Sequence, residues 1–289
     1  MLCAGFTIVK NAVRYGYPVK ESILSALPLC DAFYVLIGDC DDGTEALIRS
    51  IESEKIKIHH SVWDQSVNTN GEVLALETNK AMALIPEEYT WLLYLQADEA
   101  LHEKDYPVIQ EAMHRYQNQT RVEGLLFSYH HFWGSFSYVG TTSKWYRREI
   151  RIIKNRKDIF SYRDAQGFRK TPNHKLQVAL IDAHVYHYGW VRPPAKMQEK
   201  YAGVQQYWSN ENKYIPNQSE FDYSQIDALA EFHGTHPATM QAMVDAQSWE
   251  FTYDKRRTRM RLKEKIKRVL FRLTGYRFFE YKNYRIVSS

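Results

Sequence analysis

Two adjacent acids, Asp98 and Glu99, stand just after a short apolar run at 91–95. That run, Trp-Leu-Leu-Tyr-Leu, is typical of a strand buried on both faces of a parallel sheet. In open α/β sheets, ligands collect beyond the carboxyl ends of the strands. Two carboxylates in such a place need compensation, and a divalent metal that carries a phosphorylated ligand would supply it. A solvated acidic loop without chemistry is the competing interpretation.

The elements that must position these acids alternate between strands and helices. Strands are expected at 3–9, 32–38, 55–60, 91–95 and 124–127. Helices are expected at 18–27, 46–51, 72–85 and 105–117. This rhythm predicts an α/β fold with a mostly parallel, doubly wound sheet.

The pattern changes after about residue 128. We expect an aromatic, loop-like stretch at 130–146, and then strands at 149–154 and 176–187. Helices are expected at 195–208, weakly at 238–248, and at 258–273. The chain is therefore expected to divide into a sheet domain, 1–190, and a helical C-terminal region, 191–289.

The composition is that of an ordinary globular protein, with 44% hydrophobic and 25% charged residues among 289. Three cysteines make a disulfide framework improbable and fit a reducing compartment. The first residues lack the basic segment and apolar run of a signal peptide. No stretch approaches the roughly 18–20 apolar residues that cross a bilayer. We expect a cytoplasmic protein, with peripheral contact at the inner face of a membrane left open.

That membrane question arises from the basic tail. Residues 255–272 hold ten Lys or Arg against one acid, Glu264. One interpretation is a solvated helix that covers the domain; another is a helix at 255–273 that lies on an anionic membrane surface. Nucleic acid is not expected as a partner, because no recognition motif accompanies the tail and the rest of the chain is slightly acidic. The first two interpretations stay open.

The order of several short motifs resembles that of family 2 glycosyltransferases with the GT-A fold. The similar segments are Thr7–Asn11, Asp41–Thr44, Asn70-Gly71, Thr78-Asn79 and Gln96–Glu99. The resemblance covers roughly residues 1–190. Its second half, with Trp145–Arg148, Ser161–Arg169 and Tyr186–Trp190, looks like a bacterial branch that acts on envelope or capsule glycans.

The resemblance implies a nucleotide-sugar donor, a glycan or lipid-linked acceptor, and an inverting transfer. It implies a divalent metal, Mn²⁺ or Mg²⁺, held by Asp98 and His187. It implies Asp164 as the base, with Glu99 as the competing candidate. The donor would be bound by Asn11, Asp42, Asn70, Asn79, Gln96, Ala97, Asp98 and Arg169.

Four alternatives remain beside that interpretation. Gln96 stands where the family has an acid and supplies no charge, so a protein that binds a sugar nucleotide or glycan without catalysis is the alternative function. His187 could be a hydrogen-bonded core histidine, and Arg163 could hold Asp164 in a structural salt bridge. His184 is expected to point to the other face of its strand from His187, which argues against a joint zinc site. A nucleotidyltransferase ranks last, because no glycine- and lysine-rich phosphate loop follows the first strand.

Overall fold

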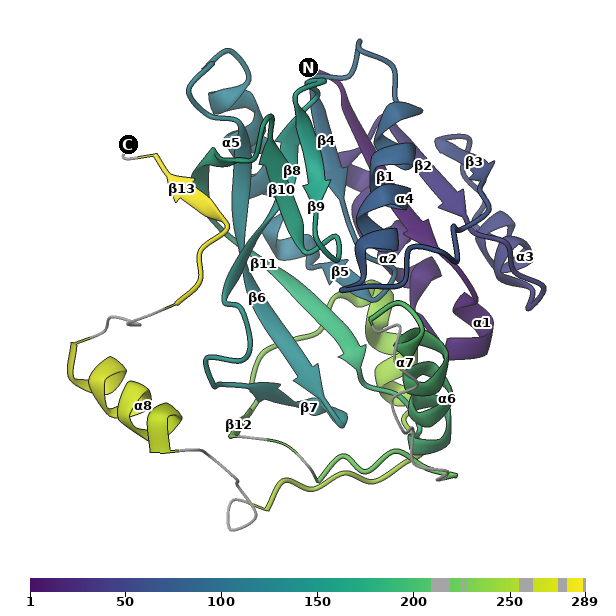
Figure 1. Ribbon diagram of the computed structural model, residues 1–289, viewed down its shortest axis with the longest axis vertical. Coiled ribbons are helices and arrows are strands. Elements are labelled where there is room, and N and C mark those ends of the chain that lie inside the picture. Colours follow the sequence, from purple (N-terminus) through teal and green to yellow (C-terminus); the bar gives the residue numbers. More distant parts are fainter. Residues whose placement is uncertain (209–218, 225, 227, 255–261, 275–279, 288–289) are drawn as a thin grey trace.

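The computed structural model describes residues 1–208, 219–224, 226, 228–254, 262–274 and 280–287 (Figure 1). One mixed sheet runs through the molecule in the order β3-β2-β1-β4-β8-β6-β11-β10-β9. Its strands are β1 Cys3–Val9, β2 Ala32–Ile37, β3 Ile56–His60, β4 Trp91–Tyr94, β5 Glu99–Leu101, β6 Gly124–Trp133, β7 Ser135–Gly140, β8 Arg148–Lys154, β9 Ile159–Tyr162, β10 Gly167–Lys170, β11 His174–Trp190, β12 Leu229–Glu231 and β13 Tyr284–Ile286.

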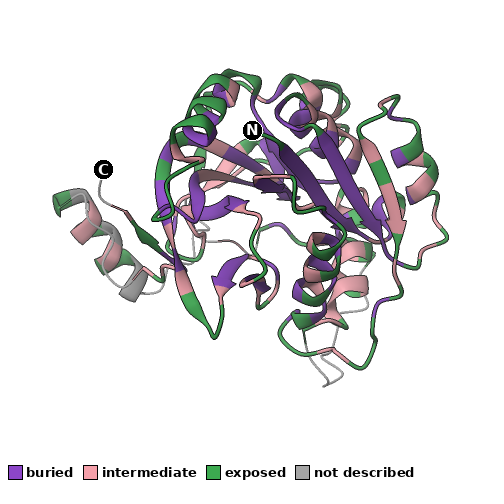
Figure 2. Ribbon diagram, turned by 90° about the horizontal axis from the view of Figure 1, so that it is seen from above, coloured by how far each residue is buried: buried purple, intermediate pink, exposed green. Residues whose placement is uncertain are grey.

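The first half of the sheet is parallel and covered on both faces. β1 pairs in parallel with β2 and β4, and β2 with β3. Helix α4 (Glu72–Ala83) packs on one face, and α2 (Val19–Ala26) and α5 (Tyr106–Tyr116) pack on the other. This double cover explains why every residue of β1, β2 and β4 is buried, as the purple strands of Figure 2 show. The expected α/β fold is confirmed.

The second half of the sheet is mixed. β8 pairs antiparallel with β4 and with β6, whereas β6 and β11 are parallel. β9 and β10 form an antiparallel hairpin that extends the sheet beyond β11. The short strand β5, which contains Glu99, pairs antiparallel with β11. The short helices that lie among the strands of the first half are α1 Ala12–Tyr15, η1 Leu27–Leu29, α3 Thr44–Arg49 and η2 Glu103–Asp105.

The stretch 130–146, expected as a loop, is largely strand, and that expectation was wrong. β6 continues to Trp133, and β7 returns along it. Phe132 and Trp133 are both buried, and each packs in a different apolar cluster. Because both faces of β6 are covered there, its residues do not alternate between polar and apolar, and the strand signal is lost. The hairpin strands β9 and β10 were also missed, since a strand of only four residues is too short to show a clear pattern.

The C-terminal region is built into the same sheet. Its helices are α6 Pro194–Gln205, η3 Ala238–Met240, α7 Gln241–Asp245 and α8 Leu262–Thr274. β13 pairs with β11, and β12 pairs with β7. The region 191–289, expected to be helical, therefore adds two strands to the sheet formed by residues 1–190. Helix α8 stands apart from the sheet in Figure 1. The described helices include none with the length and apolarity needed to cross a membrane.

Candidate active site

A cavity of about 340 Å³ lies beside the carboxyl ends of β1 and β4. It is lined by the turn after β4, the ends of β1 and β11, the loop between β9 and β10, and α6. The polar or charged side chains that line it are Lys10, Gln96, Asp98, Asp164, His187 and Lys200. Aromatic rings make up much of the remaining wall: Tyr15, Tyr17, Trp63, Tyr94, Trp190, Tyr201, Tyr207 and Trp208. The cavity therefore brings together Asp98, Asp164 and His187, three residues that the sequence predicted from distant segments.

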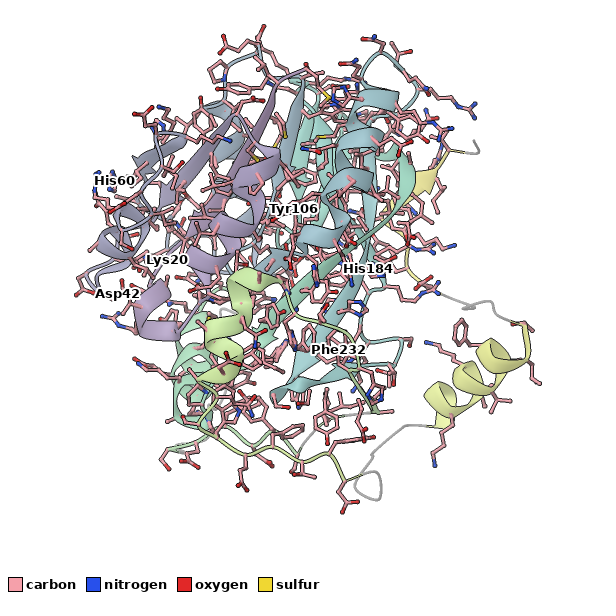
Figure 3. All side chains as sticks on the ribbon, turned by 180° about the vertical axis from the view of Figure 1, so that it is seen from behind. Lys20, Asp42, His60, Tyr106, His184 and Phe232 are labelled. Atoms are coloured by element: carbon pink, nitrogen blue, oxygen red, sulfur yellow. The ribbon has the colours of Figure 1, made fainter. Side chains whose placement is uncertain are left out.

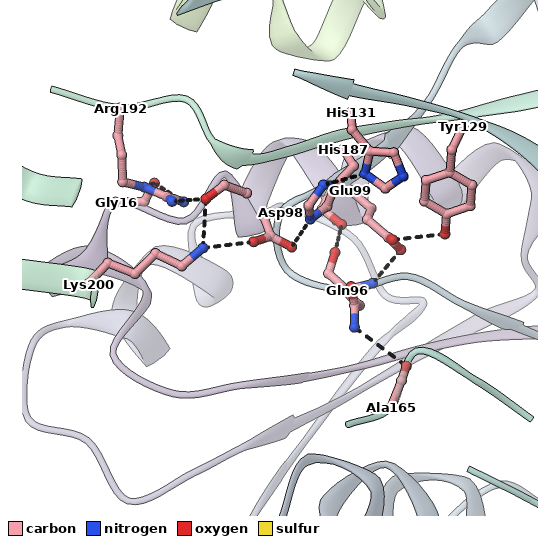
Figure 4. Close-up of polar contacts among 12 residues, drawn as sticks. Gly16, Gln96, Asp98, Glu99, Tyr129, His131, Ala165, His187, Arg192 and Lys200 are labelled. Carbon is pink, nitrogen blue, oxygen red and sulfur yellow. Dashed lines mark hydrogen bonds and ion pairs between the residues drawn. The ribbon is translucent and has the colours of Figure 1, made fainter. Parts of the chain in front are cut away.

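Asp98 is held between a histidine and a lysine (Figure 4). Its Oδ1 lies 3.7 Å from His187 Nε2, and its Oδ2 lies 3.2 Å from Lys200 Nζ. Burial by itself would raise the pKa of Asp98. The positive charges around it, that of Lys200 first and that of Arg192 among them, outweigh burial and lower the pKa to about 2. Asp98 is therefore a buried carboxylate that keeps its negative charge across the physiological range.

A chain of hydrogen bonds fixes the tautomer of His187. His131 Nε2 lies 2.8 Å from the Tyr146 carbonyl, which can only accept, so the His131 proton is on Nε2. The two Nδ1 atoms of His131 and His187 lie 3.0 Å apart, so the proton between them belongs to His187. Burial lowers the pKa of both rings, which keeps them neutral. The unprotonated Nε2 of His187 thus directs its lone pair toward Asp98.

This pair of atoms fits a divalent cation. Two ligand atoms that bind one ion at roughly 2.1 Å each can lie at most about 4.2 Å apart, and Asp98 Oδ1 and His187 Nε2 satisfy that limit. A carboxylate oxygen with an imidazole nitrogen suits Mn²⁺ better than Mg²⁺, which prefers oxygen ligands. No cluster of three or more His, Cys, Asp or Glu suited to a metal occurs among the described residues. A cation at this pair would complete its coordination with water and a ligand.

The histidine three residues earlier, His184, belongs to another environment. Its ring stacks on His130 at 4.8 Å, and His130 in turn packs against Phe232. Figure 3 shows His184 and Phe232 on the side of the sheet seen from behind. His184 and His187 therefore contact different neighbours, as the strand geometry predicted.

Asp164 sits at the tip of the β9–β10 hairpin and lines the same cavity. Its flanking residues Arg163 and Ala165 have φ of 57° and 59°, an unusual left-handed conformation for residues other than glycine. The carbonyl of Ala165 accepts a hydrogen bond from Gln96 Nε2 at 3.4 Å. Burial raises the pKa of Asp164. The Arg163 guanidinium lies 5.1 and 5.2 Å from the ring centres of Tyr162 and Tyr281, rather than in the alternative salt bridge with Asp164.

Glu99 is placed differently from the expectation. Its side chain is fully buried and forms two hydrogen bonds of 2.8 Å with Arg151. It also accepts from the Tyr129 hydroxyl at 2.9 Å and from the Gln96 backbone N–H at 3.0 Å. A fully buried carboxylate with these hydrogen bonds cannot reach the proton of a substrate, so Glu99 is not suited to be the base. It anchors the turn that presents Asp98.

The other expected donor-side residues organise loops around the cavity. Asp42 accepts hydrogen bonds from the Arg14 and Thr44 backbone N–H groups at 2.7 and 3.1 Å, which lowers its pKa against the effect of burial. Asn79 bonds the backbone of Ser161 at 2.7 and 3.4 Å and so ties α4 to the Asp164 hairpin. Asn70 has φ of 52° just before α4.

Asn11 and Arg169 differ in how their polar side-chain atoms are satisfied. Asn11 follows β1 with φ of 55°, and its Oδ1 is buried without a hydrogen-bond partner among the described residues. Arg169 donates to Asn283 Oδ1 at 2.5 Å and to the Tyr281 hydroxyl at 2.9 Å. Arg169 does not line the cavity, which corrects the expectation that it binds the donor. It fastens the C-terminal segment to the hairpin.

Lys200 and Arg192 were not among the site residues predicted from the sequence. Lys200 Nζ donates to the Gly189 carbonyl at 2.8 Å, and Arg192 Nη1 donates to the same carbonyl at 2.6 Å. Burial and the neighbouring Arg192 lower the pKa of Lys200 to about 7, although Asp98 opposes this shift. One signal was available. Lys200 shares the helical face of Met197 and Val204, both of which line the cavity, and a charge on an apolar face is unusual.

No protein-family model matches the sequence, and no curated protein matches it either. Several solved structures are similar in three dimensions. S. aureus TarS is 10% identical, with a TM-score of 0.40 over 71% of this chain and 39% of that one. Glucosyl-3-phosphoglycerate synthase from Mycobacterium tuberculosis, in complex with Mn²⁺, UDP and phosphoglyceric acid, is 14% identical, with a TM-score of 0.31 over 44% and 43%. 4-Diphosphocytidyl-2C-methyl-D-erythritol synthase from Anaerococcus prevotii DSM 20548 is 8% identical, with a TM-score of 0.33 over 53% and 70%.

The chain thus spans well under half of TarS, and 64% of a shorter TarS structure, residues 1–349. Identities of 8–14% and TM-scores of 0.40 or less assign no function to this chain, so any function must rest on the residues of the cavity. The parallel order β3-β2-β1-β4, the antiparallel β8 beside β4, and an acidic turn at the end of β4 give the chain a GT-A-like α/β fold.

Proposed function

We propose that the protein is a glycosyltransferase that moves a sugar from a nucleotide-sugar donor to a glycan or lipid-linked acceptor, assisted by Mn²⁺ or Mg²⁺. One observation carries the proposal. A single cavity holds a charged Asp98 facing the lone pair of His187, and a second carboxylate, Asp164, presented from a separate hairpin. The first pair suits a cation with a phosphorylated ligand, and the second acid suits proton transfer.

The first requirement of glycosyl transfer is charge stabilisation at the departing diphosphate. A cation bound to Asp98 and His187 would supply positive charge there. The chain's own task is to keep that pair in place. The Glu99–Arg151 ion pair fixes the turn that carries Asp98, and the His131–Tyr146 bond fixes the tautomer of His187.

The second requirement is a base for the acceptor hydroxyl. The raised pKa of Asp164 makes its carboxylate a stronger base than an exposed aspartate. The strained backbone on both sides of Asp164, and the Gln96–Ala165 hydrogen bond, hold it toward the cavity. A single base on the acceptor side is consistent with inversion at the anomeric carbon. NMR of the first-formed product tests this, and a retained anomeric configuration would exclude inversion.

The third requirement is orientation of the sugar. Trp190, Tyr17 and Trp208 line the cavity, and aromatic faces pack well against the apolar faces of sugars. Such rings would hold the donor in line with the acceptor, and preorganised geometry accounts for a large part of enzymatic rate enhancement.

The test is a donor screen with UDP-, GDP-, dTDP- and CMP-sugars, with Mn²⁺ and with EDTA, in which release of the nucleotide is measured. We expect one donor class to be turned over slowly by the wild type and about a hundredfold more slowly by Asp164→Asn. The variant should still bind that donor. A donor that binds the wild type without any turnover would favour the alternative function, a non-catalytic sugar-nucleotide-binding protein, which the charge missing at Gln96 suggests.

A further inference from the structure

The two oxygens of Asp98 face different partners, and only one of them is needed for the proposed metal. Oδ1 faces His187 Nε2, whereas Oδ2 faces the ammonium of Lys200. These contacts lie on opposite sides of one carboxylate, as Figure 4 shows. A cation on the His187 side would therefore leave the contact with Lys200 in place.

The ammonium group of Lys200 has a hydrogen-bond donor left for a ligand. Its side chain is 14% exposed, lines the cavity, and lies over the Tyr17 ring with Nζ 4.7 Å from the ring centre. An ammonium has three N–H donors. Among the described residues, Asp98 and the Gly189 carbonyl take two of them, at 3.2 and 2.8 Å. The third donor is available to an acceptor in the cavity.

The local charge also favours an anion. Arg192 is 2% exposed, and its guanidinium lies 5.2 Å from the centre of the same Tyr17 ring. Asp98 is the carboxylate that interacts with both Lys200 and Arg192. When Lys200 is protonated, two cations face one carboxylate in a buried place, and the excess positive charge requires a counter-charge. Because the cavity is the open side of this cluster, an anionic ligand there would complete it.

We propose that Lys200, backed by Arg192, binds the diphosphate of the donor from the α6 side, across Asp98 from His187. This inference rests on the proposed function. It makes α6, which lies beyond the expected sheet domain, a wall of the active site that contributes charge of its own. It further implies that part of the affinity for a diphosphate persists without a metal.

The test is calorimetric titration of the full chain with UDP and uridine, and with the corresponding guanosine, cytidine and thymidine pairs, in Mn²⁺ and in EDTA. For the nucleoside diphosphate that the wild type binds, Lys200→Gln should lower affinity about tenfold or more under both conditions, because a charge-assisted hydrogen bond is lost. Affinity for the matching nucleoside should not change. Lys200→Arg should retain most of the diphosphate affinity.

Lys196→Gln is the matched control. Lys196 lies one turn earlier on α6 and pairs with Glu199 at 3.2 Å on the surface, so its loss should leave both affinities unchanged. If Lys200→Gln does not fold, Lys200→Met, which keeps the apolar stem, replaces it. An unchanged diphosphate affinity, or an equal loss for nucleoside and diphosphate, would overturn the role of Lys200 alone. Failure of the wild type to bind any nucleoside diphosphate would overturn the proposed function as well.

Discussion

At the scale of single residues, the site depends on how its charges are neutralised. Asp98 stays charged because Lys200 and Arg192 compensate its burial, whereas His187 stays neutral because His131 and Tyr146 fix its proton. The result is a carboxylate and a lone pair that face each other, an arrangement that repels in the absence of a cation. This is the physical basis for expecting metal affinity from only two protein ligands.

The first prediction concerns Asp98→Asn. The amide keeps the shape of the side chain but removes the charge, so binding of Mn²⁺, measured by the electron paramagnetic resonance signal of the free ion, should weaken by about tenfold or more. Asp42→Asn, in a loop outside the cavity lining, is the control and should leave Mn²⁺ binding unchanged. Equal Mn²⁺ affinity in Asp98→Asn and the wild type would remove Asp98 from the metal site.

The second prediction concerns a buried acid outside the site. Burial raises the pKa of Glu149 from 4.5 to about 7. Between these values the unfolded chain releases a proton that the folded chain retains, so the free energy of unfolding should fall as pH rises from about 4.5 to 7. The loss should amount to about 3 kcal/mol and should be complete above pH 7. Glu149→Gln should flatten this slope and be the more stable protein at pH 8.

Urea unfolding of both proteins from pH 4.5 to 8.5 measures the effect. Parallel pH profiles for the wild type and Glu149→Gln would mean that Glu149 is ionised in the folded protein at an ordinary pH. The sign matters here, because a carboxylate that gains an ion pair on folding would show the reverse trend, with stability lost toward acid.

Two residues expected from the sequence line the same cavity. Asp98 was expected because it follows a buried apolar strand, and Asp164 because the family resemblance implied it. Their chemical roles stay predictions. The prediction of Glu99 as a candidate base was wrong because its partner, Arg151, is 52 positions away in the chain, and no local sequence pattern indicates that contact. Lys200 was missed because the helix that carries it was read as part of a separate region.

At the scale of elements, the turn after β4 depends on a buried ion pair. Arg151 and Glu99 are both fully buried, and they connect β8 to β5. The third prediction is that Arg151→Met lowers the free energy of unfolding by about 3–5 kcal/mol, because Glu99 is left as an unpaired buried charge. The double variant Arg151→Met/Glu99→Gln should recover part of that loss. A loss below about 1 kcal/mol in urea unfolding would contradict this structural role for Glu99.

The parallel half of the fold was predictable because its strands are short apolar runs separated by helices. The antiparallel half was not, because Phe132 and Trp133 are buried on both faces of β6 and show no alternation. The hairpin of β9 and β10 gains its stability from long-range contacts, such as those of Asn79 with Ser161. Such contacts leave no trace in local sequence.

At the scale of the whole molecule, α8 stands apart from the sheet (Figure 1). Ile266, Val269 and Leu273 are 53%, 54% and 78% exposed and recur at helical spacing. Much of the basic run, 255–261, lies outside the described residues. An exposed apolar stripe in a segment rich in Lys and Arg favours the anionic membrane surface over the solvated-helix interpretation. Peripheral membrane contact therefore remains our proposal.

The fourth prediction tests that contact. The triple variant Ile266→Ser/Val269→Ser/Leu273→Ser should pellet several-fold less than the wild type with vesicles that contain phosphatidylserine, because the apolar face is lost. Val62→Ser, 75% exposed on a distant loop, is the control and should pellet normally. Deletion of 255–289 is unsuitable, since it would remove β13 and Asn283 from the sheet. Equal pelleting of all three proteins would leave α8 a solvated helix.

The most direct test of the central claim is a thermal-shift screen of UDP-, GDP-, dTDP- and CMP-sugars with and without Mn²⁺, run on the wild type and Asp98→Asn. A ligand at a hundred times its dissociation constant should add about 2.7 kcal/mol of stability, which raises the melting temperature visibly. The account predicts a rise with one donor class that is larger with Mn²⁺, and a loss of that Mn²⁺ dependence in Asp98→Asn. No rise with any sugar nucleotide would contradict it.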